Sequence, residues 1–411
     1  MFRTLRNAEY AELMILFFIQ ASAMGAWFVP LGTILDAHGL HSLKPYAYGS
    51  SAVAAFISPL IFGAMADRHA PPALVLRGLA LATAVMLAVI ATAINFGWNH
   101  WLLLGLIQIF YLFYSPTFSI STALVFARLR DAKKEFGPIR AMATIGWMAG
   151  AILVSLLGFD RSALAGYVGV VIWLTVAGFT FWLPKLEMPA ASEKLSWHER
   201  LGLDALSLLK KREIRVVFLT TTLFNIPLSG FYPYAPAHLH DLGFTHTSAW
   251  VTLGQSTEII SMFALGWLLL KYRMKWIFLA GLGFGVARFA ISALDTKSAL
   301  LLGITLHGAS FVLVFITAQI FLDQNIDPAW RSRAQALMTL MNGGIGNLIG
   351  YLGVGWWFDA CSHSSRTHWS WFWGGLATLV SGVLVYFLIA YREKNNLARP
   401  EPLQSVTVLP R

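Results

Sequence analysis

Three polar side chains interrupt the long apolar stretch 247–270 and could together bind a ligand or exchange a proton. Thr252, Gln255 and Glu258 follow one another at intervals of three residues, so they share approximately one face of a helix. Glu258 lies about eleven residues into the stretch, at a depth where inserting a carboxylate into a bilayer costs about 2.5 to 3.5 kcal/mol. Burial penalises the charged carboxyl and favours proton exchange near neutral pH. We expect Glu258 to bind substrate or a proton; the alternative is a neutral carboxyl hydrogen-bonded between helices.

A second stripe of functional groups lies earlier in the chain. Arg140, Thr144 and Trp147 occur at i, i+4 and i+7, so one helix face presents a cation, a hydroxyl and an aromatic ring in sequence. This pattern is typical of a site for a polar ring compound. Arg140 by itself could instead anchor the helix end by extending its side chain to the lipid headgroups.

A histidine and an aromatic ring form a third set. His307 and Phe311 are an i, i+4 pair, with Gln319 two turns further on. A histidine facing Glu258 would form a proton relay, whereas a histidine in an apolar helix is otherwise a satisfied packing residue.

Helix-breaking residues follow Asn225 in another apolar stretch. Pro227 and Gly230 indicate a bent or broken helix, and such breaks are tolerated where backbone lines a cavity. We therefore place Asn225 with the substrate-binding residues. Gln20 and Arg288 are also polar residues in apolar stretches, and we interpret them as interhelical contacts.

The elements that position these side chains are long apolar helices. Of the 411 residues, 57% are apolar and 12% are charged, whereas a soluble domain carries about a quarter charged residues. An apolar helix needs about 20 residues to cross a bilayer. We predict an all-α membrane protein with twelve transmembrane helices in two six-helix halves. The predicted helices are 10–35, 46–65, 73–95, 100–127, 136–158, 163–184, 213–238, 247–270, 274–293, 298–323, 331–358 and 369–391.

The basic residues predict the topology. With a cytoplasmic amino terminus, the outer loops hold only Lys44, Arg161, Lys297 and Arg366 of the 30 Lys and Arg residues. The positive-inside rule therefore places both termini in the cytoplasm. The expected parts are an N-terminal half at 1–184, a cytoplasmic linker at 185–212, a C-terminal half at 213–392 and a cytoplasmic tail at 393–411.

Several other classes of function are excluded. The net charge of +10 arises from loops on one side of the helices rather than from one basic face, so we expect no nucleic-acid partner. With Cys361 as the single cysteine, the sequence contains no cysteine-based metal cluster. It also contains no phosphate-binding loop, dinucleotide fingerprint or nucleophile elbow. We therefore expect no enzyme activity, no metal and no cofactor.

One motif resembles the loop motif of the major facilitator superfamily. It runs Gly63-Ala64-Met65-Ala66-Asp67-Arg68, and a weaker counterpart covers Gly266 to Lys275. The resemblance implies that Asp67 and Arg68 form a conformational latch at the cytoplasmic face. It also implies alternating access between two halves.

A narrower resemblance is to the bacterial nucleoside:proton symporter family. It rests on Phe136-Gly137-Pro138-Ile139-Arg140 with Thr144-Ile145-Gly146, on Leu201-Gly202-Leu203-Asp204-Ala205, on Gln255 with Glu258, and on Asp327-Pro328-Ala329-Trp330-Arg331 with Ala334-Gln335. This resemblance implies a nucleoside site lined by Arg140, Thr144, Trp147, Gln255, Glu258 and Phe311. The chain departs from the family pattern at Pro227 and Gly230, and at His307 and Val312.

From these features we expect proton-coupled uptake of a nucleoside by alternating access, driven by the proton gradient. The coupling group is Glu258, by itself or with His307. The resemblance implies a monomer in the inner membrane of a bacterium, with a nucleoside, protons and bilayer lipid as its partners. The alternatives are a carrier of the same fold for a sugar or other small polar solute, and a membrane sensor that binds without transport.

Overall fold

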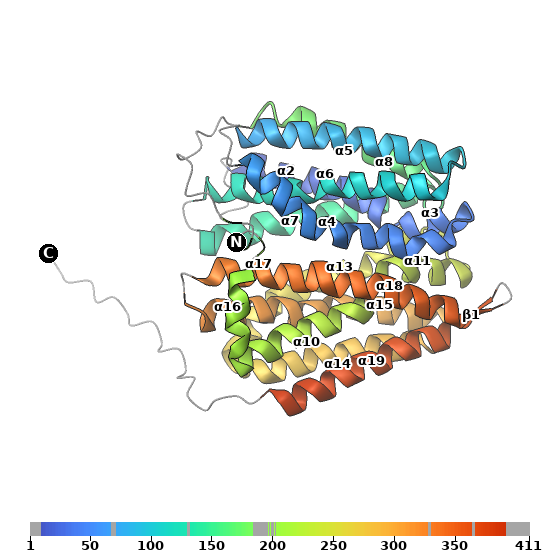
Figure 1. Cartoon of the computed structure of the whole chain (residues 1–411). Coiled ribbons are helices and arrows are strands. Elements are labelled where there is room, and N and C mark those ends of the chain that lie inside the picture. The colour runs from blue at the N-terminus through green and yellow to red at the C-terminus, as the bar shows by residue number, and fades with distance from the viewer. Residues whose placement is uncertain are drawn as a thin grey trace.

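A computed structural model gives the arrangement of the chain and describes residues 10–66, 71–129, 132–183, 196, 198, 201, 203–327, 330–363 and 366–391. Helices dominate these residues, as predicted (Figure 1). Among them, nine single helices or runs of consecutive helices are long and apolar enough to cross a membrane. The predicted all-α membrane class is confirmed at this level.

The helices of the first part of the chain follow the predicted apolar stretches. They are α2 (Ala11–Phe28), α3 (Leu31–Ala37), α4 (Lys44–Ala66), α5 (Pro72–Asn95), α6 (His100–Phe126), α7 (Ala132–Leu156) and α8 (Leu164–Phe179), with a short 3-10 turn η2 (His41–Leu43) before α4. The first predicted helix is thus divided, because α2 ends just before Pro30 and α3 begins after it. A proline lacks the backbone N–H that a continuous helix would use there.

The second part of the chain contains more interrupted helices. Its elements are η3 (Leu203–Lys210), α10 (Arg212–Leu228), α11 (Phe231–Asp241), α12 (Thr247–Val251), α13 (Leu253–Lys271), α14 (Met274–Ser292), α15 (Lys297–Phe311), η4 (Val312–Ile316), α16 (Thr317–Asn325), α17 (Arg331–Thr339), η6 (Leu340–Gly346), α18 (Asn347–Cys361) and α19 (Trp369–Ala390). The expected break near Gly230 separates α10 from α11. Two π-helical segments, η4 and η6, were not predicted.

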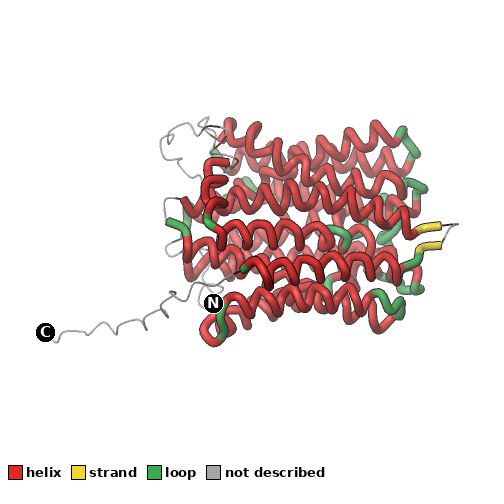
Figure 2. Tube along the Cα trace, turned by 60° about the horizontal axis from the view of Figure 1, so that its bottom comes forward, coloured by secondary structure: helices red, strands yellow, loops and turns green. Residues whose placement is uncertain are grey.

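The helices run side by side between two ends of the molecule (Figure 2). We call the end where α2 begins and α19 finishes the terminal end. The opposite end carries two short antiparallel strands, β1 (Ser362–His363) and β2 (Arg366–Thr367), and we call it the hairpin end. Helices α2 to α8 lie together, and α10 to α19 form a second group beside them (Figure 1). The two groups meet where α4 contacts α18 and η6, where α3 contacts α11, and where α7 contacts α12.

Glycines allow close packing of the helix that carries the Arg140 stripe. A Cβ atom at Gly146 or Gly150 of α7 would collide with the backbone of Phe18 or Ser22 of α2. Small residues at this spacing let two helix backbones approach each other within a membrane. The contact fixes α7 against α2 and so fixes the direction in which its polar stripe faces.

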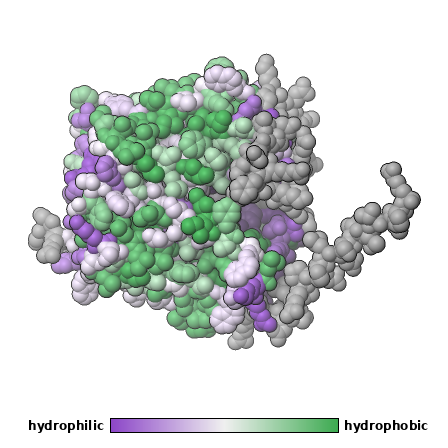
Figure 3. Space-filling view, turned by 180° about the vertical axis from the view of Figure 1, so that it is seen from behind, coloured by the Kyte–Doolittle hydropathy of each residue, from purple (hydrophilic) through white to green (hydrophobic). Residues whose placement is uncertain are grey.

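The outer surface agrees with a membrane environment. Hydrophobic residues cover much of the side of the molecule, while hydrophilic residues gather toward its ends (Figure 3). Exposed large apolar side chains occur on many of the helices, including Leu81, Val85, Ile260 and Leu388. A soluble protein would expose such contiguous apolar surface only at an interface.

Some predicted features lie outside the described residues. They are the latch residues Asp67 and Arg68, most of the expected linker 185–212, and the expected tail 393–411.

Candidate functional site

A cavity of about 1130 Å³ lies between the two groups of helices. Several lining residues, among them Thr122 of α6, Arg140 of α7 and Gln335 of α17, are within a few turns of the helix ends at the terminal end. Its walls come from α2, α6, α7, α11, α13 and α17.

The structure brings five of the predicted substrate-binding residues together in this cavity. Arg140, Thr144 and Trp147 line it from α7, while Gln255 and Glu258 line it from α13. The wall therefore contains a cation and a carboxyl from different groups of helices. Within the described part of the chain, neither Arg140 nor Glu258 has a hydrogen-bond or ion-pair partner in the protein. Both groups are therefore available to a solute or to water in the cavity.

The amide of Gln255 is only half satisfied. Its Nε2 atom donates a hydrogen bond of 2.8 Å to the hydroxyl of Tyr232 in α11. Its Oε1 atom is buried and has no hydrogen-bond partner among the described residues. Leaving a buried acceptor unpaired costs about 1 to 3 kcal/mol, and a ligand donor at this position would recover that cost.

Aromatic rings form one side of the cavity. Trp147 and Tyr232 line the cavity with their ring centroids 5.6 Å apart. The ring of Phe28 in α2 is not among the lining residues but packs against both, with centroid distances of 5.6 Å and 5.5 Å. These three rings join α2, α7 and α11. Flat rings at such a position can stack on a planar ligand and exclude water from it.

A close contact between two helices sets the position of Glu258. A Cβ atom at Gly308 of α15 would collide with the backbone of Glu258 and Gly254 in α13. The two backbones therefore touch at the level of the carboxyl. Any side chain at Gly308 would displace the segment that carries Glu258.

His307 and Phe311 are not among the residues lining the cavity. His307 is buried, stacks on Phe231 with ring centroids 4.1 Å apart, and hydrogen-bonds through Nδ1 to the buried guanidinium of Arg288. Its ring also contacts that of Tyr232 edge-on at 6.3 Å. His307 thus supports the aromatic wall from behind, and Phe311 stacks on it from the same helix.

Asn225 and Gln20 make contacts between helices. The amide of Asn225 donates to the carbonyl of Asn342 at 2.8 Å and to Asn347 Oδ1 at 2.6 Å, which holds α10 against η6 and α18. Gln20 Oε1 accepts a hydrogen bond of 2.7 Å from Ser121, which joins α2 to α6. Asn225 is not among the cavity-lining residues.

Several residues of the cavity wall were not predicted. Helix α6 contributes five of them, and Tyr232, Gln335 and Thr339 come from other helices; those of α6 are Tyr114, Ser115, Phe118, Ser119 and Thr122. A signal was present, because Ser115, Ser119 and Thr122 occur at i, i+4 and i+7, the same spacing as the Arg140 stripe.

At the hairpin end, the buried carboxylate of Asp160 joins the two groups of helices. It lies between α7 and α8, and its Oδ1 atom accepts hydrogen bonds of 2.7 Å from Ser155 Oγ and from the backbone N–H of Ser248 in α12. Ser155 Oγ in turn accepts from the backbone N–H of Ala249 at 2.9 Å. His246 Nδ1 donates to the carbonyl of Ser155 at 2.6 Å. This set of contacts holds α12 against α7 at the hairpin end.

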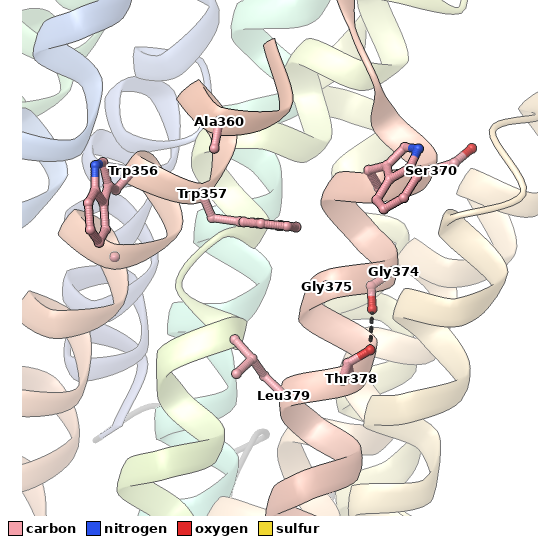
Figure 4. A pocket seen from close by; sticks show the side chains of 10 residues that line it. Trp356, Trp357, Ala360, Ser370, Gly374, Gly375, Thr378 and Leu379 are labelled. Carbon is pink, nitrogen blue, oxygen red and sulfur yellow. Dashed lines mark hydrogen bonds between the residues drawn. The ribbon is translucent and has the colours of Figure 1, made fainter.

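A second hollow, of about 910 Å³, lies between α18 and α19. Trp356, Trp357 and Leu379 form its sides, and the hydroxyl of Thr378 is satisfied by the carbonyl of Gly374 at 3.0 Å (Figure 4). None of its lining residues carries a charge. It therefore offers an apolar surface groove and lacks the groups for polar recognition.

The fold and the central polar cavity together define a membrane carrier of the major facilitator fold. Residues 8–396 match the family described as nucleoside H+ symporter. The chain belongs to this family.

Relatives and solved structures agree with this assignment. The chain is 32% identical to YegT of Escherichia coli (strain K12), which carries the name of a nucleoside transporter, over 94% of each chain. It is 24% identical to the nucleoside permease NupG and 25% identical to the xanthosine permease of the same organism, covering at least 94% of each chain. A crystal structure of NupG superposes with a TM-score of 0.84 at 23% identity, covering 94% of this chain and 100% of that one. The fold is also shared with the transporter PepTSo, at a TM-score of 0.70 and 12% identity, covering 92% and 97% of the two chains.

Proposed function

We propose that the protein carries nucleosides across the membrane together with protons, by alternating access. The observation that carries this proposal is the content of the cavity. One space holds the carboxyl of Glu258, the guanidinium of Arg140, an unpaired acceptor on Gln255 and the rings of Trp147 and Tyr232. A neutral, planar and hydroxylated solute matches this combination.

Each group has a role in the proposal. The rings of Trp147 and Tyr232 stack on the nucleobase. Gln255, Thr144 and Arg140 form hydrogen bonds with the polar edges of the ligand, since an amide, a hydroxyl and a guanidinium offer donors and acceptors of different geometry. Glu258 takes up a proton when the cavity is accessible and releases it on the other side. His307, Phe311 and Asn225 act behind the cavity wall by holding the helices that form it.

The topology belongs to the same proposal. Twelve transmembrane helices form two halves of six, each with a separate role in alternation, and both termini lie in the cytoplasm of a bacterium with the protein in its inner membrane. The cavity then opens to the cytoplasm, and the contacts around Asp160 close the outer side. Asp67 and Arg68 form the cytoplasmic latch, and the carrier works as a monomer. Rocking of the halves would break the outer contacts and form new ones at the terminal end.

Transport by purified protein in liposomes tests the proposal. With an inward proton gradient, we expect accumulation of uridine, and Glu258→Gln should abolish accumulation while retaining binding, because the amide is uncharged but cannot exchange a proton. Accumulation against a gradient by Glu258→Gln would show that the proton uses another group.

A panel of competitors separates the alternatives. Nucleosides should inhibit uridine uptake, whereas hexoses and pentoses should not. Inhibition by sugars alone would indicate a sugar carrier. Binding of nucleosides without any counterflow exchange would indicate a sensor rather than a carrier.

A further inference from the structure

One wall of the cavity has no role in the function proposed above. Along α6, Ser115, Ser119 and Thr122 line the cavity at successive helical turns, with the rings of Tyr114 and Phe118 beside them. The stripe from Ser115 to Thr122 extends about 10 Å along the helix, at about 1.5 Å per residue.

These three hydroxyls differ from most others in the helices. The hydroxyls of Ser22, Thr83, Thr92 and Thr175 each donate to the carbonyl four residues earlier, at 2.7 to 2.9 Å. Within the described part of the chain, Ser115, Ser119 and Thr122 have no hydrogen bond to protein.

The opposite face of α6 is satisfied. Thr117 donates to the carbonyl of Tyr114 at 2.6 Å, and Ser121 donates to Gln20 at 2.7 Å. Among the serine and threonine hydroxyls of α6, those without a partner in the described part of the chain are therefore the three that line the cavity. This division within one helix indicates a surface that binds a hydroxylated ligand or water.

The chemistry of a hydroxyl decides which part of a nucleoside suits this wall. A Ser or Thr hydroxyl is both donor and acceptor and rotates to suit its partner, as does a hydroxyl of a sugar. A nucleobase edge has fixed donors and acceptors, which the amide of Gln255 and the guanidinium of Arg140 match better. Aromatic rings such as Tyr114 and Phe118 also offer a flat apolar surface to the C–H face of a sugar.

We propose that Ser115, Ser119 and Thr122 form a sugar subsite that binds the 2′- and 3′-hydroxyls of the nucleoside. The inference rests on the proposed nucleoside transport and adds the part of the cavity that selects the sugar. Helices α6 and α7 contact each other directly, so the sugar subsite and the Arg140 stripe are adjoining walls. A site built to hydrogen-bond a ligand hydroxyl rejects an analogue that lacks it, because groups on the site are then left unpaired.

Competition binding on the full chain in detergent tests the subsite. Radiolabelled uridine is displaced by uridine, 2′-deoxyuridine and 2′,3′-dideoxyuridine, for the wild type and for the triple variant Ser115→Ala, Ser119→Ala, Thr122→Val. We expect the wild type to prefer uridine over the dideoxy analogue. In the triple variant, each hydrogen bond removed should lower the ratio of the two affinities by a factor of about five. Its affinity for the dideoxy analogue should stay within about twofold of the wild-type value.

Two further variants make the result decisive. Ser119→Ala alone changes an exposed side chain and should lose part of the preference without affecting folding. Thr175→Val removes a hydroxyl that is already bonded within α8, and it should bind all three ligands as the wild type does. Full preference for uridine in both the triple and the Ser119→Ala variants would overturn the sugar subsite. Absence of any nucleoside binding by the wild type would instead overturn the proposed function itself.

Discussion

The side chains of the cavity wall differ in how completely their polar groups are satisfied. Gln255 uses its amide N–H₂ to hold Tyr232. Among the described residues, the carbonyl oxygen of Gln255, the carboxyl of Glu258 and the guanidinium of Arg140 have no hydrogen-bond partner. A buried polar group that lacks a hydrogen-bond partner costs free energy, and such groups are typical of ligand-binding sites. Behind the wall, in contrast, His307 and Arg288 are paired with each other.

Replacement of Gln255 tests the value of its free acceptor. Gln255→Ala should weaken uridine binding by at least about tenfold, because the ligand loses a buried hydrogen-bond partner and Tyr232 loses its donor. Tyr232→Phe keeps the ring and the amide and should weaken binding less. Equilibrium binding on purified protein measures both. Equal losses in the two variants would show that Gln255 only holds the tyrosine.

Replacement of the buried Arg288 tests the packing behind the cavity wall. Its guanidinium is buried, stacks against Phe231 and Phe289, and hydrogen-bonds to His307. Arg288→Ala should destabilise the protein by at least about 2 kcal/mol, because it leaves a void and removes a partner of His307. Arg288→Met retains most of the volume and should unfold at a temperature closer to that of the wild type.

The transport assay on the same variants decides whether this pair carries protons. Arg288→Met should still accumulate uridine under a proton gradient, since Glu258 remains in the cavity. Loss of the proton dependence with retained binding would place Arg288 and His307 in the proton path.

The helices of the second part of the chain position the site through close backbone contacts. Gly308→Val should push α15 away from α13 and displace Glu258, with a cost of about 1 to 3 kcal/mol for overpacking. Gly283→Val is the matched control, because a Cβ atom at Gly283 meets open space. Gly308→Val should lower the unfolding temperature and weaken uridine binding, whereas Gly283→Val should keep the wild-type values of both. Normal binding by Gly308→Val would show that Glu258 tolerates a shift of its helix.

The positions of the helices could be predicted from the sequence, whereas only some of the breaks within them could. Long apolar stretches bounded by charged residues identify helices, because within a membrane only helices and closed barrels satisfy all backbone hydrogen bonds internally. The break at Gly230 was predicted because proline and glycine are visible signals. The π-helical segments η4 and η6 were not, because an apolar run such as Val312 to Ile316 reads the same in an α-helix and a π-helix.

The residues of the site could likewise be predicted only in part. Depth along a helix placed Arg140, Thr144, Trp147, Gln255 and Glu258 at the level of one cavity, and all five line it. Depth does not fix the direction in which a side chain points. His307 lies on an adjacent helix but points behind Tyr232, toward Arg288, and this direction depends on packing between α14 and α15.

At the scale of the whole molecule, contacts at the hairpin end hold the two groups of helices together. Asp160 and Ser155 bind the first turn of α12, and Arg161 hydrogen-bonds to His240 at 2.7 Å. Gly32 of α3 also lies so close to Pro233 that a Cβ atom there would be 2.7 Å from its carbonyl oxygen. Opening of this end requires all of these contacts to separate.

Replacement of Asp160 should shift the equilibrium toward a form open at the hairpin end. Asp160→Ala removes the acceptor for the backbone N–H of Ser248, which is a bond between the two groups, and so weakens the closed form more than the open form. Spin labels at Phe96→Cys and Leu294→Cys, in a Cys361→Ser background, report the distance between the two groups at exposed positions. We expect Asp160→Ala to add a population at longer distance.

The same pair of spin labels measures a control variant and the result that would contradict this prediction. Thr175→Val lies away from these contacts and should leave the distance distribution unchanged. An unchanged distribution in Asp160→Ala, with retained thermal stability, would show that Asp160 does not bias the two forms.

The π-helical segment η6 has a consequence for how this cavity can diverge among relatives. A π-helical turn accommodates one more residue than an α-helical turn, so it records the equivalent of a one-residue insertion. Deletion of one residue between Leu340 and Gly346 would restore an α-helix and leave α17 in nearly the same rotation relative to α18, because a π-helical turn uses about one residue more than an α-helical turn to complete the same rotation. Gln335 and Thr339 would then still face the cavity. The chain can therefore lose a residue at this place without exchanging the side chains that α17 presents to the site.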